Sequence, residues 1–265
     1  MSTRSLGSEL RAIAEQLARS AGDMALNGRK SGDVTATTKS SPTDMVTQYD
    51  KASEEMVTNG LRTLRPDDGI VGEEGASREG TSGITWHIDP IDGTSNFYFD
   101  IPMWAVSIGA VDEYGPIAGA VYAPALGDMF TASRGDGATL NGSPISVRSN
   151  SLLGDALVGT GFSYHADKRD IHGRRVAQMM MHIRDIRRLG AAAIDLCFVA
   201  CGRYDAYFEE NLQSWDLVAG QIIATEAGAI ITDFSGDAVT PAQVLATQPG
   251  IQSDLIQLIA QSSEK

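Results

Sequence analysis

Residues 84–97 read ITWHIDPIDGTSNF, and this stretch decides the fold. Its first five residues strongly favour β-structure, so a buried strand is expected to reach solvent at Asp89. A proline stiffens the following turn, and Asp92 comes three residues later, so the two carboxylates can converge on one centre. Gly93 and Thr94 then begin a short helical segment or turn, whose free N–H groups form an anion site.

Two carboxylates beside an anion site allow two interpretations. In the first, Asp89 and Asp92 only cap a turn. In the second, a cation lies between the carboxylates and the anion. Hard oxygen ligands at this density suit Mg²⁺, which is usually held by a few carboxylates and by substrate phosphate. The stretch alone does not decide between the two.

The flanking segments predict short strands that form an antiparallel meander joined by tight turns. The expected strands are GIVGEE (69–74), ITWHID (84–89), WAVSIGAV (104–111), IAGAVYAP (117–124) and DMFTAS (128–133).

Two helices are expected before these strands. Residues 6–24 carry apolar side chains at three- and four-residue steps, and Asn27 and Gly28 end that helix. The polar segment 27–44 contains three positive charges and few apolar residues, so it is either a mobile connector or a flap over a site. A second helix is predicted over residues 47–64. Its expected inward-facing residues are Met56, Val57, Leu61 and Leu64.

Strands and helices alternate from about residue 152, which predicts an α/β half. The expected strands cover residues 155–161, 182–187, 205–209 and 229–234, and the expected helices cover residues 171–181, 191–200 and 215–227. A length of 265 residues suggests about two domains or one large one. We therefore predict an N-terminal α+β half (1–150) that carries most metal ligands and a C-terminal α/β half (151–265) that completes the substrate pocket. The boundary near residues 148–151 is soft, within one compact unit.

The composition excludes several classes of protein. A hydrophobic content of 42% excludes disorder, and a net charge of -13 repels phosphate backbones, so nucleic acid is not expected as the main ligand. The sequence contains no run of about 18 apolar residues, so no membrane span is predicted. Its first residues also lack the apolar run of a signal peptide. Cys197 and Cys201 lie in an apolar stretch and are interpreted as small buried residues rather than a disulfide or metal pair. These features indicate a reducing cytoplasm.

Four short pieces carry the chemistry: DMVTQYD (44–50), GEEG (72–75), DPIDGTSNF (89–97) and WD (215–216). In this order and spacing they resemble the signatures of the inositol monophosphatase family, and the resemblance extends over nearly the whole chain. It implies an α/β fold, an α+β layered sandwich of the sugar-phosphatase type with alternating helix and sheet layers. It also implies a homodimer and Mg²⁺-dependent hydrolysis of a phosphate monoester.

The resemblance further implies roles for individual residues. The ligands of two or three Mg²⁺ ions would be Glu73, Asp89, Asp92, Asp216 and the main-chain carbonyl of Ile91, with Asp89 bridging two ions. Glu73 and Thr94 would orient the attacking water, and Asp50 would hold Thr94 by a hydrogen bond. Substrate contacts would come from Asp92, Gly93, Thr94, Ser163, Gly190, Ala192 and Glu209. Lys39 matches a mobile basic residue near the third metal.

Some positions depart from the family pattern. Ala191 replaces a hydroxyl residue often found there, which removes one side-chain contact to a ligand. Gln213 stands where animal members have His, so no role is transferred to it, and Asn211 and Leu212 are uninformative. Glu74 is interpreted as a structural carboxylate.

The residues favour metal-activated water over a side-chain nucleophile, because no Cys, Ser or His lies in a nucleophile motif. The partner is expected to be a small phosphorylated metabolite, with inositol 1-phosphate first. Histidinol phosphate is the main alternative, since Glu209 and Glu210 would attract its amine. The same two carboxylates would repel a second negative group, so 3′-phosphoadenosine 5′-phosphate and fructose 1,6-bisphosphate rank lower. A non-catalytic regulatory binding protein is the alternative from a different class.

Overall fold

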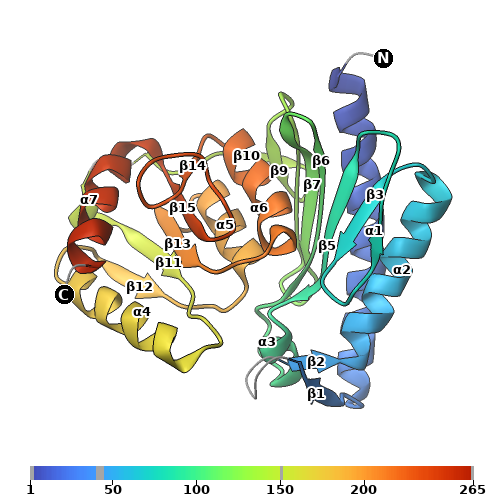
Figure 1. Cartoon of the computed structure of the whole chain (residues 1–265), viewed down its shortest axis with the longest axis horizontal. Coiled ribbons are helices and arrows are strands. Elements are labelled where there is room, and N and C mark those ends of the chain that lie inside the picture. The colour runs from blue at the N-terminus through green and yellow to red at the C-terminus, as the bar shows by residue number, and fades with distance from the viewer. Residues whose placement is uncertain (1–2, 40–44, 150–151, 264–265) are drawn as a thin grey trace.

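The computed structural model describes residues 3–39, 45–149 and 152–263. They form layers in the order helix, sheet, helix, sheet, helix (Figure 1). The helices are α1 (Thr3–Ser31), α2 (Gln48–Leu64), α3 (Thr94–Tyr98), α4 (Ala166–Met179), α5 (Ala192–Ala200), α6 (Ser214–Glu226) and α7 (Gln252–Ser263), with 3₁₀ turns at Leu153–Asp155 and Pro249–Ile251. The strands are β1 (Ala36–Thr38), β2 (Met45–Thr47), β3 (Gly69–Gly72), β4 (Ser77–Arg78), β5 (Thr85–Asp92), β6 (Ala105–Asp112), β7 (Gly115–Ala123), β8 (Asp128–Ser133), β9 (Ala138–Leu140), β10 (Ser143–Ile145), β11 (Leu157–Thr160), β12 (Asp185–Arg187), β13 (Ala206–Glu210), β14 (Ile230–Thr232) and β15 (Gln243–Thr247).

The first large sheet has the strand order β10-β9-β8-β7-β6-β5-β3-β4. From β5 to β10 each strand pairs antiparallel with the next, as the expected meander requires. The prediction is wrong for its first strand, because β3 pairs parallel with β5. Helices α1 and α2 cover one face of this sheet, and α6 packs on the other face.

The second sheet has the order β12-β11-β13-β15-β14. Strands β12, β11 and β13 are parallel, and β15 runs antiparallel to both of its neighbours. Helices α4 and α7 cover its outer face, so the alternation of elements predicted for this half is confirmed.

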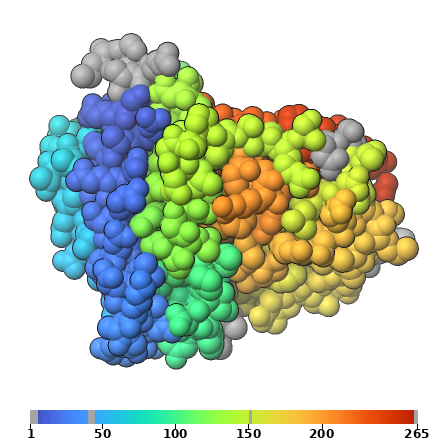
Figure 2. Space-filling view, turned by 180° about the vertical axis from the view of Figure 1, so that it is seen from behind, coloured from blue at the N-terminus to red at the C-terminus, as the bar shows by residue number. Residues whose placement is uncertain are grey.

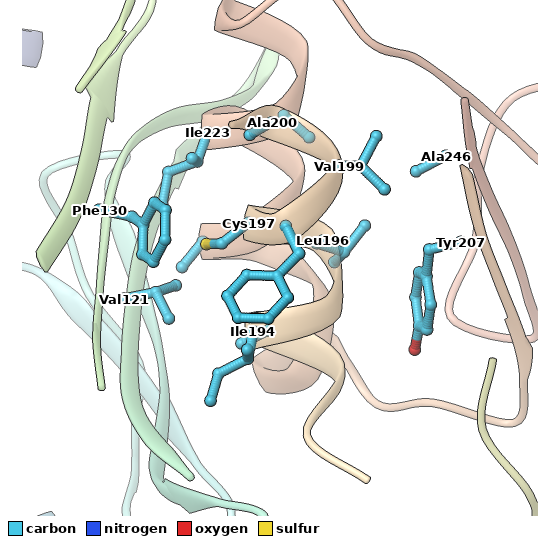
Figure 3. Packing of buried hydrophobic residues seen from close by; sticks show 14 of the residues in the cluster. Val121, Phe130, Ile194, Leu196, Cys197, Val199, Ala200, Tyr207, Ile223 and Ala246 are labelled. Atoms are coloured by element: carbon cyan, nitrogen blue, oxygen red, sulfur yellow. The ribbon is translucent and has the colours of Figure 1, made fainter. Parts of the chain in front are cut away.

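Helix α5 lies in the core between the two sheets, and all of its residues are buried. Figure 3 shows Cys197 facing Val121 and Phe130 of the first sheet, while Val199 faces Ala246 of the second. A helix that is apolar on every side has to be covered on every side. Both halves of the chain therefore share one core, and from behind they form one continuous body (Figure 2). The predicted layered α/β fold class is confirmed.

The first helix does not end at Asn27 and Gly28, as the sequence suggested. It continues to Ser31, and Gly32 follows in the left-handed region with φ of 81°. A Cβ atom at Gly28 would lie 2.0 Å from Cε1 of Tyr49. Gly28 is therefore a packing position inside the helix, where the backbone leaves room for an aromatic ring.

The polar segment 27–44 is also more regular than expected. Its first residues belong to α1, and β1 pairs antiparallel with β2. Residues 40–44, and with them Asp44, lie outside the described residues, as do residues 150–151 of the predicted boundary. In the ranges that are described, no helix is both long and apolar enough to cross a lipid bilayer.

Two inward-facing predictions for α2 are wrong. Val57 and Leu61 are fully buried as expected, whereas Met56 is 37% exposed and Leu64 is 46% exposed. Met56 lies at the edge of the apolar stripe, and Leu64 lies in the last turn, where the sheet no longer covers the helix. Sequence reasoning also missed β15 and α7, which complete the second sheet and its outer cover.

Candidate active site

A bulge at the end of β5 brings two carboxylates of the candidate site together. Asp89 pairs with Ser107 of β6, and Asp92 pairs with Ala105, so β5 advances three residues while β6 advances two. One extra residue in a strand bends it and redirects its side chains. Pro90 lies within this bulge, where its missing N–H removes no regular ladder bond.

Helix α3 begins directly after the bulge, at a tight turn. Gly93 adopts φ of 88°, and a Cβ atom there would lie 2.9 Å from the carbonyl oxygen of Met103. The side-chain amide of Asn96 donates to the carbonyls of Met103 and Leu189, at 2.6 and 2.8 Å. The turn is thus held from both halves of the chain, with the main-chain N–H groups of Gly93 and Thr94 at its start.

Asp50 lies behind Thr94 and is fully buried. The Thr94 hydroxyl is 2.9 Å from Oδ1 of Asp50 and 3.0 Å from the Ile91 carbonyl. The other carboxylate oxygen of Asp50 accepts from the N–H and hydroxyl of Thr47, which closes a capping box on α2. Burial raises the pKa of Asp50 to about 6, although the hydrogen bonds from Thr47 and Thr94 act to lower it.

The second carboxylate group stands at the end of β3. Lys39 donates to Oε1 of Glu73 at 2.9 Å and also pairs with Glu74. Burial lowers the pKa of the Lys39 ammonium, but the charges of the two glutamates outweigh burial and raise it above its usual value. The turn itself is fixed by Glu54, whose carboxylate accepts from the main-chain N–H groups of Glu74 and Ala76, both at 2.8 Å.

Main-chain N–H groups at the N-terminal ends of two helices in the C-terminal half donate hydrogen bonds to two of the acidic residues. Asp92 accepts from the N–H groups of Ala192 and Ala193 in the first turn of α5, at 3.0 and 2.8 Å. Asp216 accepts from the N–H of Gln213, the residue that caps α6, at 2.7 Å. A carboxylate at such a position is stabilised by unpaired N–H groups and by the helix dipole.

The carboxylates of Asp89, Asp92 and Asp216 form one wall of the site, and their charges call for a cation. Burial raises the pKa values of Asp89, Asp92 and Asp216, in the case of Asp92 to about 7, and the neighbouring carboxylates raise them further. In the described ranges, Lys39 is the only cationic side chain that pairs with this group, through Glu73. Buried carboxylates that repel one another suit a hard divalent ion.

The donor set consists of carboxylate oxygens and one main-chain carbonyl oxygen, which are hard ligands. Across the described residues, no group of three or more His, Cys, Asp or Glu side chains is already arranged to hold a metal ion. Mg²⁺ usually keeps several waters and takes one or two carboxylates together with substrate phosphate. Carboxylates on one open wall, with the Ile91 carbonyl beside them, match that mode of binding.

These residues face one cavity of about 670 Å³. All predicted site residues except Asp50 line it, namely Lys39, Glu73, Asp89, Ile91, Asp92, Gly93, Thr94, Ser163, Gly190, Ala192, Glu209 and Asp216. Asp50 contacts the cavity only through Thr94. Segments more than 100 residues apart therefore form one pocket at the junction of the two sheets.

Sequence reasoning missed two basic residues in this pocket, Lys168 of α4 and Arg188 after β12. Lys168 lies in no motif, and Arg188 begins the segment RLGAA (188–192), to which the resemblance assigned roles only at Gly190 and Ala192. It also treated Asn211 as uninformative, whereas its side chain accepts a hydrogen bond from Lys168 at 2.6 Å. The pocket is thus acidic at one wall and carries two cations elsewhere in its lining.

The prediction that Glu210 repels a second negative group on the substrate is wrong. Its carboxylate forms an ion pair with Arg175 and lies 3.1 Å from His172, both on α4. Burial alone would raise the pKa of Glu210, but the hydrogen bonds from His172 and Arg175 lower it to about 2. The charge of Glu210 is therefore already compensated within the protein.

Residues 7–265 match the inositol monophosphatase family. The chain is 40% identical to an inositol-1-monophosphatase of Mycobacterium bovis, and the match covers 93% of this chain and 92% of that protein. It is 37% identical to a Pasteurella multocida protein named Nus factor SuhB over 251 residues, which cover 93% and 94%.

Solved structures are similar along the whole chain. The extragenic suppressor protein suhB from Bartonella henselae has a TM-score of 0.90 at 32% identity, covering 95% of this chain and 98% of that chain. An IMPase from Thermotoga maritima has a TM-score of 0.88 at 31% identity, covering 96% and 97%. The resemblance inferred from the four acidic pieces is confirmed, and the members of this family are generally metal-dependent. The chain belongs to the inositol monophosphatase family and is a phosphomonoesterase.

Proposed function

We propose that this protein hydrolyses a small polyol phosphate, with inositol 1-phosphate as the first candidate, and that two or three Mg²⁺ ions are its cofactors. The observation that carries the proposal is the gathering of Asp89, Asp92 and Asp216 with Glu73 around one pocket, next to a buried Thr94–Asp50 pair. Relatives named inositol-1-monophosphatase support the choice of substrate.

The ions would be held by Glu73, Asp89, Asp92, Asp216 and the Ile91 carbonyl. When bound, Mg²⁺ would neutralise the carboxylates, polarise the phosphate and lower the pKa of a water molecule. The main-chain N–H groups of Gly93 and Thr94 would donate to the phosphate oxygens, as the family resemblance implies.

Thr94 and Glu73 would orient the attacking water. The Thr94 hydroxyl donates a hydrogen bond to Asp50, so the lone pairs of its oxygen remain free to accept a hydrogen bond from water. Glu73 would accept the second hydrogen of that water. The water oxygen would then attack phosphorus in line with the leaving alcohol while one of its protons passes to Glu73. The P–O bond to the alcohol breaks, and the leaving oxygen takes up a proton from solvent water, which gives the polyol and inorganic phosphate.

Glu209 would recognise the polyol. It lines the pocket and accepts a hydrogen bond from the Tyr207 hydroxyl at 2.5 Å, which orients its carboxylate. A site built to bond a hydroxyl rejects an analogue without that hydroxyl by about 10⁴-fold or more. Ser163, Gly190 and Ala192 would complete the walls around the ring. Histidinol phosphate remains the alternative, because its cationic amine would also pair with Glu209.

Phosphate release with Mg²⁺, and with EDTA as the metal-free control, tests the proposal. The panel contains inositol 1-phosphate, histidinol phosphate, 3′-phosphoadenosine 5′-phosphate and fructose 1,6-bisphosphate, for wild type and Glu209→Gln. We expect inositol 1-phosphate to be preferred and Glu209→Gln to raise its KM. If the KM does not change, the role of Glu209 is wrong and histidinol phosphate becomes the first candidate. If no monoester is hydrolysed, a regulatory binding role is left, which some relatives' name, Nus factor, suggests.

We further propose that residues 1–150 and 151–265 act as halves of one unit. The hydrogen bonds from Ala192 and Ala193 to Asp92 support this, because they join the halves at the site itself. The two free cysteines are consistent with a reducing cytoplasm.

A homodimer is also proposed, on the family resemblance. Phe99 and Ile101 follow α3 and are 66% and 46% exposed, so apolar surface is available close to the site. Sedimentation at micromolar concentration tests this, and a monomer there would remove the proposal.

A further inference from the structure

We propose that Lys168 and Arg188 form a second anion-binding subsite in the same pocket, and that among phosphate monoesters of one carbon chain those with a second anionic group are preferred over the neutral one. This inference deepens the proposed function and rests on it. It also reverses the expectation, drawn from Glu209 and Glu210 alone, that a second negative group would be repelled.

The two cations come from a different part of the fold than the carboxylates. Lys168 lies on α4 and Arg188 follows β12, both in the second-sheet half, whereas Glu73 and Asp89 end strands of the first sheet (Figure 1). All four line the same cavity of about 670 Å³. A substrate held by its phosphate at the carboxylate wall can therefore direct its other end toward Lys168 and Arg188.

Arg188 is an exposed residue of the pocket lining. Among the described residues it forms no ion pair, and its guanidinium lies 5.9 Å from the centre of the Phe162 ring. Gly190 makes room for it, since a Cβ atom there would lie 2.3 Å from Nη1 of Arg188. Its charge also acts on Glu209: burial raises the pKa of Glu209, and Arg188 opposes that rise.

Lys168 is held in place by a neutral group. Its ammonium donates to Oδ1 of Asn211 at 2.6 Å, and no carboxylate of the described residues pairs with it. Asn211 adopts φ of 65°, a left-handed conformation that Asn tolerates better than most residues. An ammonium has three N–H donors, so one bond to Asn211 leaves others for an anion.

The neighbouring acids act on these charges in different ways. Glu210 is already paired with Arg175 and His172, which removes its repulsion. Among the described residues Glu209 and the buried Asp195 form no ion pair, and the charge of Arg188 opposes the rise in pKa that burial causes in both. Such a set of groups suits a substrate that offers both a hydroxyl, for Glu209, and an anion, for the two cations.

Three substrates with one six-carbon chain test the subsite: glucitol 6-phosphate, 6-phosphogluconate and glucitol 1,6-bisphosphate. They differ at carbon 1, which carries a hydroxyl, a carboxylate or a phosphate, so the panel separates the two sources of the second charge. A charge-assisted hydrogen bond should favour an anionic substrate over the neutral one by about 10- to 100-fold in kcat/KM. The wild-type enzyme is assayed with Mg²⁺ at constant ionic strength.

The variants Arg188→Gln and Lys168→Gln should each remove most of this preference, measured as the ratio of kcat/KM values. Each has a matched control one residue away that does not line the pocket. Arg187 is exposed and paired with Asp185, and Arg169 is exposed, so Arg187→Gln and Arg169→Gln should keep the ratio.

The outcomes separate the subsite from the function. If none of the substrates in either panel releases phosphate, the proposed function fails. If phosphate is released but glucitol 6-phosphate is preferred, the subsite is wrong and the phosphatase proposal stands. A preference that persists in both Arg188→Gln and Lys168→Gln also overturns the subsite, because the second charge would then be recognised elsewhere.

Discussion

Thr94→Val removes one hydroxyl from the proposed site and keeps the shape of the side chain. That hydroxyl lies 2.9 Å from Oδ1 of Asp50, and both side chains are buried. A hydrogen bond to a charged group contributes about 1.5–3 kcal/mol, and one pKa unit corresponds to about 1.4 kcal/mol. Without the bond, the pKa of Asp50 should therefore rise from about 6 to roughly 7–8.

The sign of the pH dependence follows from this rise. The bond stabilises the charged form of Asp50, so its loss costs about 1.5–3 kcal/mol only where Asp50 is ionised in the folded wild type. Unfolding in denaturant should show the full cost near pH 9 and almost none near pH 5, where the buried carboxyl is protonated with or without the bond. Thr94→Ser, which keeps the hydroxyl, is the matched control.

The effect on catalysis should exceed the effect on stability. Loss of an orienting or proton-transferring group costs about 10²–10⁴-fold in rate, while Mg²⁺ binding should be unchanged because the Thr94 side chain is not a proposed ligand. Phosphate release gives kcat, and titration calorimetry gives the Mg²⁺ affinity. A wild-type kcat in Thr94→Val, or an equal loss in Thr94→Ser, would refute the role of the hydroxyl.

Other residues give predictions of different kinds. Asp89→Asn should abolish turnover and weaken Mg²⁺ binding with the fold intact, because it removes charge from a proposed metal ligand. Calorimetry and phosphate release check this prediction, and turnover near the wild-type value would contradict the assignment. Lys39→Gln removes the ammonium that pairs with Glu73, so Mg²⁺ should bind about fivefold more tightly by calorimetry; weaker binding would show that Lys39 supports the metal instead. Glu210→Gln removes the ion pair with Arg175, which is 6% exposed, and should lower the free energy of unfolding by about 1.5–3 kcal/mol at pH 7. Because the pKa of Glu210 is lowered from 4.5 to about 2, this cost should fade as the pH falls through that interval; an equal cost at pH 7 and pH 2.5 would count against the ion pair.

Local patterns predicted the parts of the fold that local forces determine. The residues before Asp89 strongly favour β-structure, so β5 was evident from the sequence, although the strand continues through Pro90 to Asp92. Gly28 was misread because the glycine makes room for the ring of Tyr49, which packs on the helix from another element. The sequence indicates that a glycine is unusual, but not whether it ends a helix or admits a neighbour.

The charged residues of the pocket also divide into those that local sequence predicts and those that only the tertiary structure reveals. The acidic wall could be predicted because its residues fall in short, family-specific pieces. The pairing of Glu210 with Arg175 depends on how α4 packs beside β13, and nothing near either residue indicates it. Lys168 and Arg188 enter the pocket for the same reason, so the balance of charge at the substrate end required the tertiary structure.

The hydrogen bonds between Asp92 and the start of α5 also set an order of events during synthesis. They join residues 100 and 101 positions apart, so the carboxylate leaves the ribosome long before the N–H groups that hold it. At about 5–20 residues per second, the first half waits roughly 5–20 seconds for this partner. Throughout that interval Asp92 lacks the helix that fixes its carboxylate. A nascent chain of this protein therefore carries Glu73, Asp89 and Asp92 well before it has a pocket to place them in.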